Sequence, residues 1–231
     1  MPGTVVELFR YPVKSLGGES LQRAAVTPRG LAADRVLAVY TDDGGIGSGK
    51  TTQRFRRVDG LLRLAARLDG GRPVIDFADG TTAPAQDPDT DQRLSELLGR
   101  PLSVRAEAAV SHHDDCPVHV VTTASLRRLE ELLGEPVDVR RLRPNIVVDL
   151  PGAGFAEDDW KGRRLAVGGG LVLEVTAGMP RCVMVNADQI GLSHDSRLLK
   201  LIAREHDLEV GVQAAVVRPG PVAVGDEVRL A

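Results

Sequence analysis

The sequence is poor in aromatic residues and in cysteine. Phe, Trp and Tyr make up only 3% of the 231 residues. Platforms on which bases could stack are therefore nearly absent, which argues against binding of single-stranded nucleic acid. The two cysteines, Cys116 and Cys182, are too few for a disulfide scaffold and fit a reducing compartment, with a single bridge between them left open. We accordingly expect a cytoplasmic protein.

Long apolar runs and blocks of like charge are missing as well. No apolar stretch approaches the length of a membrane span, and the N-terminus lacks the basic and apolar regions of a signal peptide. The formal net charge of -3 arises from interspersed acids and bases. Neither a nucleic-acid footprint nor a membrane-binding basic face is indicated, so we expect no nucleic acid and no membrane among the partners.

Most of the patterned segments have the alternation of short strands, and three segments have the caps and apolar stripes of helices. The predicted strands are residues 4–10, 21–27, 35–41, 74–77, 145–150, 171–176, 182–186, 210–217 and 227–230, with a weak preference for strand at 61–68. The predicted helices are residues 87–99, 123–134 and about 195–205. Strands and helices do not alternate regularly, so we predict a mainly β (α+β) protein built on an antiparallel barrel with a few helices. Residues 105–116 are the best candidate for a join between two lobes.

A glycine-rich stretch at residues 44–51 matches the phosphate-loop pattern letter for letter. A working phosphate loop must open a helix, yet residues 52–60 carry no apolar helical stripe and soon meet a glycine. We therefore predict a hairpin turn here and disfavour a nucleotide-hydrolysing site. Its polar surface could still contact an anion.

The stretch from His112 to His119 contains three histidines and Cys116, which raises the question of a zinc site. No second pair of ligands follows at the usual spacing, and adjacent histidines point to opposite faces of an extended chain. Histidines in a solvated loop are the ordinary explanation, and we adopt it.

Cys182 follows Arg181 directly, and a neighbouring cation favours the thiolate over the thiol. A cysteine flanked by Val and Met can equally be a small buried apolar residue. Two other cationic stretches could each hold an anion or lie in solvent: residues 11–15, with Lys14 and Ser15, and residues 140–145, with Arg143 and Asn145. The residues alone leave these alternatives open.

Taken in order, these fragments resemble the MOSC family, named for the C-terminal domain of molybdenum-cofactor sulfurase. Residues 11–15, Gly30-Leu31 and Asp34-Arg35 are similar to the N-terminal MOSC barrel. The fragments similar to the MOSC domain itself are residues 143–147, Asp158-Asp159-Trp160, Gly162, Arg181-Cys182, Asp188, Pro219-Gly220 and Gly225-Asp226. The resemblance implies an N-terminal β-barrel lobe at residues 1–105 packed on a MOSC β-barrel at residues 106–231.

The resemblance also implies a molybdenum cofactor, molybdenum on molybdopterin, with Cys182 as the protein ligand of the metal. A soft thiolate suits molybdenum, and the phosphate of the cofactor needs a cationic cradle. By position, Lys14, Ser15 and Arg35 are expected at the phosphate end. Three further residues are expected at the pterin or near the metal, and two at the pocket wall: Arg143, Asn145 and Arg181, then Asp114 and Cys116.

The activity that the resemblance implies is reduction of an N-hydroxylated or similar N-oxygenated small molecule. The sequence ends without the cysteine-rich ferredoxin-like extension of some relatives, so electrons are expected from a separate donor of ferredoxin, flavodoxin or cytochrome type with its reductase. The alternatives are a sulfur carrier or cofactor-delivery protein with a persulfide on Cys182, and a binding protein without turnover.

Overall fold

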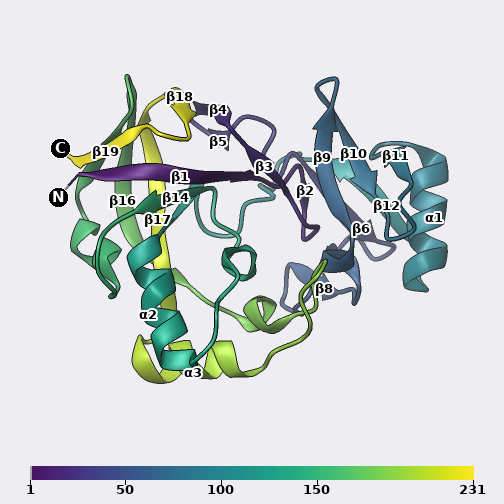
Figure 1. Ribbon diagram of the computed structural model, residues 1–231. Helices are drawn as coiled ribbons and strands as arrows, with labels where there is room; N and C mark the ends of the chain where they lie inside the picture. Colours follow the sequence, from purple (N-terminus) through teal and green to yellow (C-terminus); the bar gives the residue numbers. More distant parts are fainter. Residues whose placement is uncertain (1) are drawn as a thin grey trace.

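The computed structural model describes residues 2–231 and contains two lobes side by side (Figure 1). Most of the regular structure is β, with three α-helices among the described residues: α1 (Pro88–Leu98), α2 (Thr123–Leu133) and α3 (Arg197–Glu205). The predicted fold class, mainly β with a few helices, is confirmed. Within residues 2–231, no helix combines the length and apolar character that a membrane crossing requires.

A closed barrel forms the larger lobe, on the left of Figure 1. Its seven strands follow the spatial order β14-β13-β17-β16-β15-β19-β1, and β1 closes the ring by pairing with β14. The strands are β1 (Gly3–Arg10), β13 (Val118–Thr122), β14 (Ile146–Asp149), β15 (Arg164–Val167), β16 (Leu171–Pro180), β17 (Glu209–Arg218) and β19 (Glu227–Leu230). All neighbours are antiparallel except β13 and β14, which α2 connects as a parallel pair.

The first strand of the chain belongs to this barrel and not to the smaller lobe. In β1, Thr4 pairs with Asp149 on one side and with Glu227 on the other. A small sheet covers the barrel nearby, formed by β4 (Arg23–Thr27), β5 (Gly30–Leu31) and β18 (Gly220–Ala223), while β3 (Glu19–Leu21) extends β1. The chain therefore reaches the smaller lobe only after contributing to the larger one, and the division into domains at residues 1–105 and 106–231 stays a prediction.

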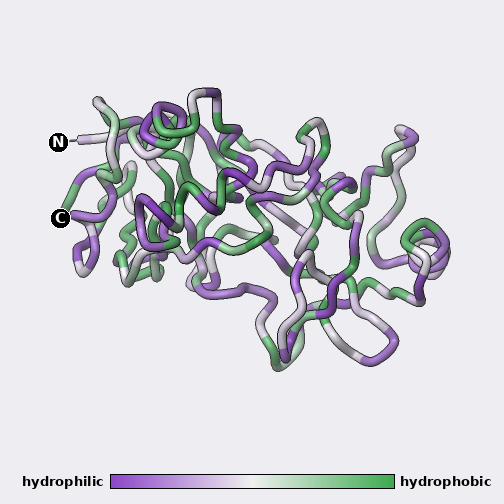
Figure 2. Tube along the Cα trace, turned by 90° about the horizontal axis from the view of Figure 1, so that it is seen from below, coloured by the Kyte–Doolittle hydropathy of each residue, from purple (hydrophilic) through white to green (hydrophobic). Residues whose placement is uncertain are grey.

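The smaller lobe has two sheets and helix α1, around a second apolar core that includes Leu16, Leu61, Ile75 and Leu94. Figure 2 shows hydrophobic segments within both lobes and hydrophilic ones along many loops. The first sheet contains β2 (Val13–Lys14), β6 (Leu37–Thr41), β7 (Ile46–Ser48), β8 (Phe55–Arg57) and β12 (Leu102–Ala106). The second contains β9 (Ala65–Asp69), β10 (Arg72–Asp76) and β11 (Thr82–Pro84).

Local capping explains why two helices lie where the sequence predicts them. Asp87 accepts a hydrogen bond from the backbone N of Asp89 at the start of α1, and Gly99 ends the helix with φ of 70°. Thr122 Oγ1 accepts from the backbone N of Ser125 at the start of α2, which ends at Gly134 with φ of 81°. Both ends need a left-handed residue, and glycine adopts that conformation without a steric cost.

Two strand predictions are wrong in whole or in part. Residues 182–186 form a 3-10 turn, η4 (Val183–Asn186), because Val185 is buried beneath α3 and the Asn186 side chain accepts from the Leu199 backbone N. Residues 61–68 divide into a 3-10 turn, η1 (Leu61–Arg63), and β9. The remaining 3-10 turns are η2 (Val139–Arg141) and η3 (Ala156–Trp160).

The glycine-rich stretch opens no helix, as predicted, but it is not a single hairpin. A tight turn lies at its start, where β6 and β7 pair antiparallel around Gly44, with φ of 77°. Residues 49–54 then form a wider loop, because β8 pairs parallel to β7. This loop faces the other lobe, where Met184 lies against Gly49.

Candidate functional site

A cavity of about 260 Å³ is lined by residues from both lobes. It brings together all nine residues that the sequence singled out. They are Lys14, Ser15, Arg35, Asp114, Cys116, Arg143, Asn145, Arg181 and Cys182. Residues that are more than 160 positions apart in the chain thus meet in one place, and below we call this place the cationic cavity.

Three of the lining residues have left-handed backbone conformations although none is a glycine. Ser15, Arg35 and Arg143 have φ of 68°, 51° and 53°. Each lies at an end of a strand: Ser15 follows β2, Arg35 precedes β6, and Arg143 precedes β14. Only six non-glycine residues in the described chain have positive φ, so half of them are at this cavity. Such strained residues concentrate at functional sites because the surroundings must hold them in place.

The cavity wall carries five cations and two carboxylates. Lys14 Nζ lies 2.6 Å from Asp114 Oδ1, and Lys50 Nζ lies 3.8 Å from Asp114 Oδ2. Burial lowers the pKa of Lys14 to about 8, although the Asp114 carboxylate opposes that shift. Burial is the largest influence on the pKa of Asp114 and raises it, but Lys14, Lys50 and Arg35 together outweigh burial and the net shift is downward. One carboxylate is thus shared between two ammonium groups.

Two partly buried guanidinium groups have hydrogen-bond donors that are not all used within the protein. Burial lowers the pKa of both Arg143 and Arg181 to about 10. Arg181 Nη2 donates to the Leu142 carbonyl at 2.7 Å, while its Nε is buried without a hydrogen-bond partner. Arg143 forms none of the ion pairs found within residues 2–231. A buried cation without a counter-ion favours an anionic ligand.

Tyr11 supports two of these cations. The guanidinium carbon of Arg143 lies 4.3 Å from the centre of the Tyr11 ring, and that of Arg35 lies 4.8 Å from it. Arg35 also pairs with the buried carboxylate of Asp34, which accepts from the Tyr11 backbone N at 2.8 Å. Burial raises the pKa of Tyr11 to about 12, and its hydroxyl has no partner. The ring, not the hydroxyl, is therefore the useful part of this residue.

The two cysteines are free and differ in their surroundings. The Cys116 thiol donates to the Val118 carbonyl at 3.2 Å, and burial raises its pKa to about 11. Cys182 is half-buried, directly after β16 and beside Arg181, with η4 beginning at the next residue. Cys116 therefore stays protonated near neutral pH, while Cys182 has a cation next to it in the sequence.

His112 and His119 are buried and His113 is partly buried, contrary to the expectation of a solvated loop. His112 bonds to the Tyr40 hydroxyl at 3.0 Å and to the Arg35 carbonyl at 3.1 Å, and His119 contacts the Arg143 carbonyl at 3.3 Å. Burial lowers the pKa of His113 to about 4 and that of His119 well below its usual value. These residues pack the loops that present the arginines, and no group of three or more His, Cys, Asp or Glu side chains placed to hold a metal ion occurs within residues 2–231.

Asn145 has a structural contact on each side of its amide. Its Oδ1 accepts from the His119 backbone N at 3.1 Å, and its Nδ2 donates to the Phe9 carbonyl at 3.3 Å. The side chain thereby ties β1, β13 and β14 together at the cavity. One Nδ2 hydrogen stays available to a ligand, so Asn145 can contribute at most one donor.

Sequence reasoning missed Tyr11, Ser48, Lys50 and His119 as parts of the site. Lys50 was visible as the lysine of the phosphate-loop pattern, whose polar surface was expected to contact an anion at most. Tyr11 was visible three residues before Lys14. Neither signal indicates the distant residues that Lys50 and Tyr11 contact.

The side chains of the cavity fit a ligand that carries both an anionic group and a soft centre able to bind a thiolate. Lys14, Lys50 and Arg143 supply positive charge, Arg181 Nε supplies a buried donor without a partner, and Cys182 supplies sulfur. The fold and the site together define a two-lobed β protein with a cationic cavity between the lobes and a free thiol in its wall.

The chain belongs to the MOSC family, since it matches the MOSC domain over residues 107–229 and the MOSC N-terminal beta barrel domain over residues 2–107. It is 26% identical to mitochondrial amidoxime-reducing component 1 of Mus musculus, over 99% of this chain and 82% of that protein. It is 28% identical to molybdenum cofactor sulfurase of Caenorhabditis briggsae, over 85% of this chain but only 31% of that protein.

A solved structure, that of the YUAD protein from Bacillus subtilis, has the same fold. The TM-score is 0.55 at 13% identity, over 99% of this chain and 94% of that one. At this identity the likeness concerns the fold alone. Recognition of the family from the ordered motifs is thereby confirmed, and the relatives are named for amidoxime reduction and for the molybdenum cofactor.

Proposed function

We propose that this protein binds the molybdenum cofactor in the cationic cavity and reduces an N-hydroxylated or similar N-oxygenated small molecule. The observation that carries the proposal is Cys182 in the wall of a cavity that five cations line. A cofactor with a terminal phosphate needs such charge, and molybdenum accepts a thiolate ligand. The names of the relatives support the choice of cofactor and substrate class.

Different residues of the cavity would bind different parts of the cofactor. Lys14, Lys50, Ser15 and Arg35 would hold the phosphate, and Arg143 and Arg181 would contact the pterin, with Asn145 donating one hydrogen bond. Cys182, the half-buried free thiol next to Arg181, would bind the metal. When bound, the cofactor supplies the electron-transfer chemistry at molybdenum. The ion pair between Asp114 and Lys14 would then weaken, because the phosphate carries more negative charge than the carboxylate and competes for the ammonium.

The reaction needs two electrons and two protons. A hydroxylamine group R-NHOH with two electrons and two protons gives R-NH₂ and water, so a donor must bring the electrons. We propose a separate ferredoxin, flavodoxin or cytochrome-type protein with its reductase, in the cytoplasm. The relatives named for amidoxime reduction are the support for a separate redox partner.

Metal analysis with two matched cysteine variants tests the proposal. The chain is produced in a host that makes the cofactor, and molybdenum is measured in the wild type, in Cys182→Ala and in Cys116→Ala. We expect about one molybdenum per wild-type chain, nearly none in Cys182→Ala, and wild-type content in Cys116→Ala, because the Cys116 thiol is protonated and bonded to Val118. Equal metal in wild type and Cys182→Ala would refute the assignment of Cys182.

A sulfur-carrier function is the second candidate, favoured by the relative named molybdenum cofactor sulfurase and by the free, half-buried thiol of Cys182. Here the Cys182 thiolate attacks the outer sulfur of a persulfide on a cysteine desulfurase, forming a Cys182 persulfide and releasing the donor thiolate. Intact mass spectrometry after incubation with a desulfurase and cysteine would show an added sulfur atom. A mass that stays unchanged counts against this candidate.

A further inference from the structure

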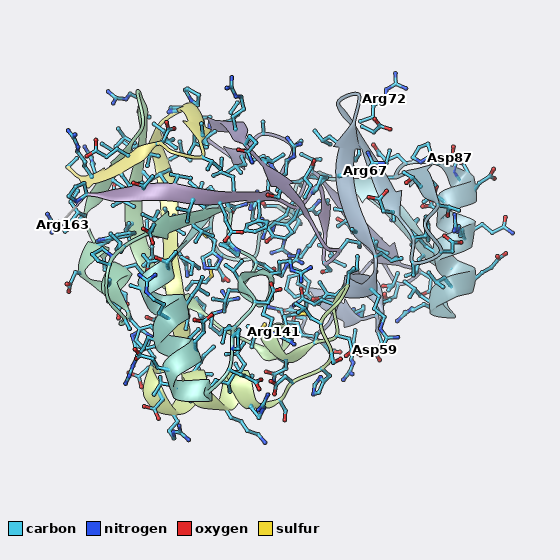
Figure 3. All side chains as sticks on the ribbon, viewed as in Figure 1. Asp59, Arg67, Arg72, Asp87, Arg141 and Arg163 are labelled. Carbon is cyan, nitrogen blue, oxygen red and sulfur yellow. The ribbon has the colours of Figure 1, made fainter. Side chains whose placement is uncertain are left out.

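A second hollow, larger than the cationic cavity, lies beside it. This groove of about 1060 Å³ is lined on one side by η1 and the end of α1, and on the other by η4 and the residues after it. Figure 1 shows the segment after β16 running across to β8 before it returns to α3. Asp59, labelled in Figure 3, belongs to the groove wall on the smaller lobe.

The groove and the cationic cavity share their dividing wall. In η4 and the residue before it, Cys182 and Met184 line the cavity, while Val183 lines the groove. In the facing loop, Ser48 and Lys50 line the cavity and Gly49 lines the groove. A Cβ on Gly49 would lie 2.4 Å from Met184 Sδ, so the two walls touch there. The groove therefore begins one residue from Cys182.

The groove has apolar side chains in its base and in both walls, together with charged and polar ones. Leu61 and Leu62 are part of its lining and belong to the core of the smaller lobe. Leu97 is 55% exposed on one wall, and Val183 is 51% exposed on the other. Exposed apolar side chains on two facing walls, over an apolar base, are typical of small-molecule pockets.

The charged side chains around the groove are paired, except for the Glu96 carboxylate, for which no ion pair occurs within residues 2–231. Arg57 pairs with Asp59 at 2.8 Å, and Arg63 pairs with Asp188 at 2.7 Å across the two lobes. The cationic cavity differs, because its five cations face two carboxylates. Neighbouring hollows thus select for different ligands: an anion in the cavity, and a molecule without net charge in the groove.

We propose that the groove binds the apolar body of an uncharged small-molecule substrate, whose reactive end then lies over Val183 toward Cys182. The direction of the reactive end rests on the proposed function, whereas the binding of the apolar body does not. The volume is at the upper end of about 300–1,000 Å³, the range in which small molecules are usually bound. Leu97 and Val183 are accordingly specificity-determining residues on opposite walls.

Binding of benzamidoxime to the full chain tests this proposal without turnover. Titration calorimetry is done with the wild type and with Cys182→Ala, which separates binding in the groove from metal binding. Leu97→Gln and Val183→Thr each remove apolar surface from one wall. Val217→Gln is the control, since Val217 is 42% exposed on β17 and is not part of the groove.

We expect saturable binding to the wild type and to Cys182→Ala, and an affinity about fivefold lower in Leu97→Gln and Val183→Thr. Val217→Gln should bind like the wild type, and 4-carboxybenzamidoxime should bind no more tightly than benzamidoxime. The proposal is overturned if both wall variants bind normally, if the wild type does not bind, or if the carboxylate is preferred. Molybdenum content reports separately on the proposed function, so either idea can fail alone.

Discussion

Lys14 and Asp114 are separated by 100 residues in the sequence and by 2.6 Å between Nζ and Oδ1. The pair joins the end of β2 to the segment that connects the two lobes. Because Lys14 is 5% exposed, its ammonium loses most of its hydration and depends on this carboxylate. Asp114 therefore acts as an internal counter-ion where an external anion is proposed to bind.

Anion affinity should fall as the pH rises above 8. Lys14 in the free protein has a pKa of about 8, so above that pH an anion must bind together with a proton. We expect the Kd for sulfate, which does not titrate in this range, to increase up to about tenfold per pH unit from pH 8 to 9.5. Calorimetry in buffers of different ionisation enthalpy measures both affinity and proton uptake.

Two variants control this experiment. Lys14→Arg should bind sulfate with little dependence on pH in this range, because a guanidinium keeps its charge. Asp114→Asn should bind sulfate more tightly at pH 7, since the competing carboxylate is gone, and should lose affinity from a lower pH onward. An unchanged pH profile in Lys14→Arg would show that another group titrates.

Tyr11 should matter for anion binding through its ring. Tyr11→Leu removes the surface on which Arg35 and Arg143 lie, and we expect sulfate affinity to fall about threefold to tenfold. Tyr11→Phe keeps the ring, so its affinity should match the wild type. It should also raise the free energy of unfolding by about 1 kcal/mol, because the buried hydroxyl has no partner. Weak binding in Tyr11→Phe would contradict this role.

The two thiols should react at different rates with iodoacetamide. With a pKa of about 11, Cys116 is thiolate in only about one molecule in a thousand at pH 8. We expect Cys182 to be alkylated first at pH 8, and the rate at Cys116 to increase about tenfold per pH unit above it. Peptide mass spectrometry over time distinguishes the sites, and preferential alkylation of Cys116 would contradict the structure.

Glu157 should make stability depend on pH. Burial raises the pKa of Glu157 above 4.5, although the hydroxyls of Ser125 and Thr122 donate to it at 2.6 Å each and oppose the shift. The folded protein then holds a proton that the unfolded chain releases, so the free energy of unfolding should fall as the pH rises from 4.5 through the pKa of the folded state.

Urea unfolding between pH 4.5 and 8 tests this expectation. Glu157→Gln should flatten the slope, since its side chain does not titrate. Glu157→Ala should lower the free energy of unfolding by about 2–3 kcal/mol, because two buried hydroxyls lose their acceptor at the start of α2. A slope that persists in Glu157→Gln would assign it to a different group.

Local signals explain which elements the sequence could predict. Helices α1 and α2 depend on residues within the same turn, such as Asp87, Thr122 and their terminal glycines, and both lie where predicted. Residues 182–186 have a strand-like composition, but they form a turn, because Val185 packs in the core beneath α3. Tertiary packing outweighs propensity in so short a segment.

In the site, too, some features could be predicted from the sequence and others depend on tertiary contacts. The nine predicted residues came from ordered motifs, and they meet at one cavity because the barrel brings distant strand ends together. The contacts of Tyr11 with Arg35 and Arg143 were not predictable, since they depend on left-handed turns at both arginines. Likewise, nothing local indicates that Lys50 lies close to Asp114 in the segment that connects the two lobes.

Because β1 pairs with both β14 and β19, the barrel closes late in the synthesis of the chain. Thr4 is synthesised well before its partners Asp149 and Glu227. The barrel therefore cannot close until nearly the whole chain is available, and its formation is governed by slow, long-range strand pairing. Until then both edges of β1 lack their barrel partners, and such unpaired edges favour pairing with other chains.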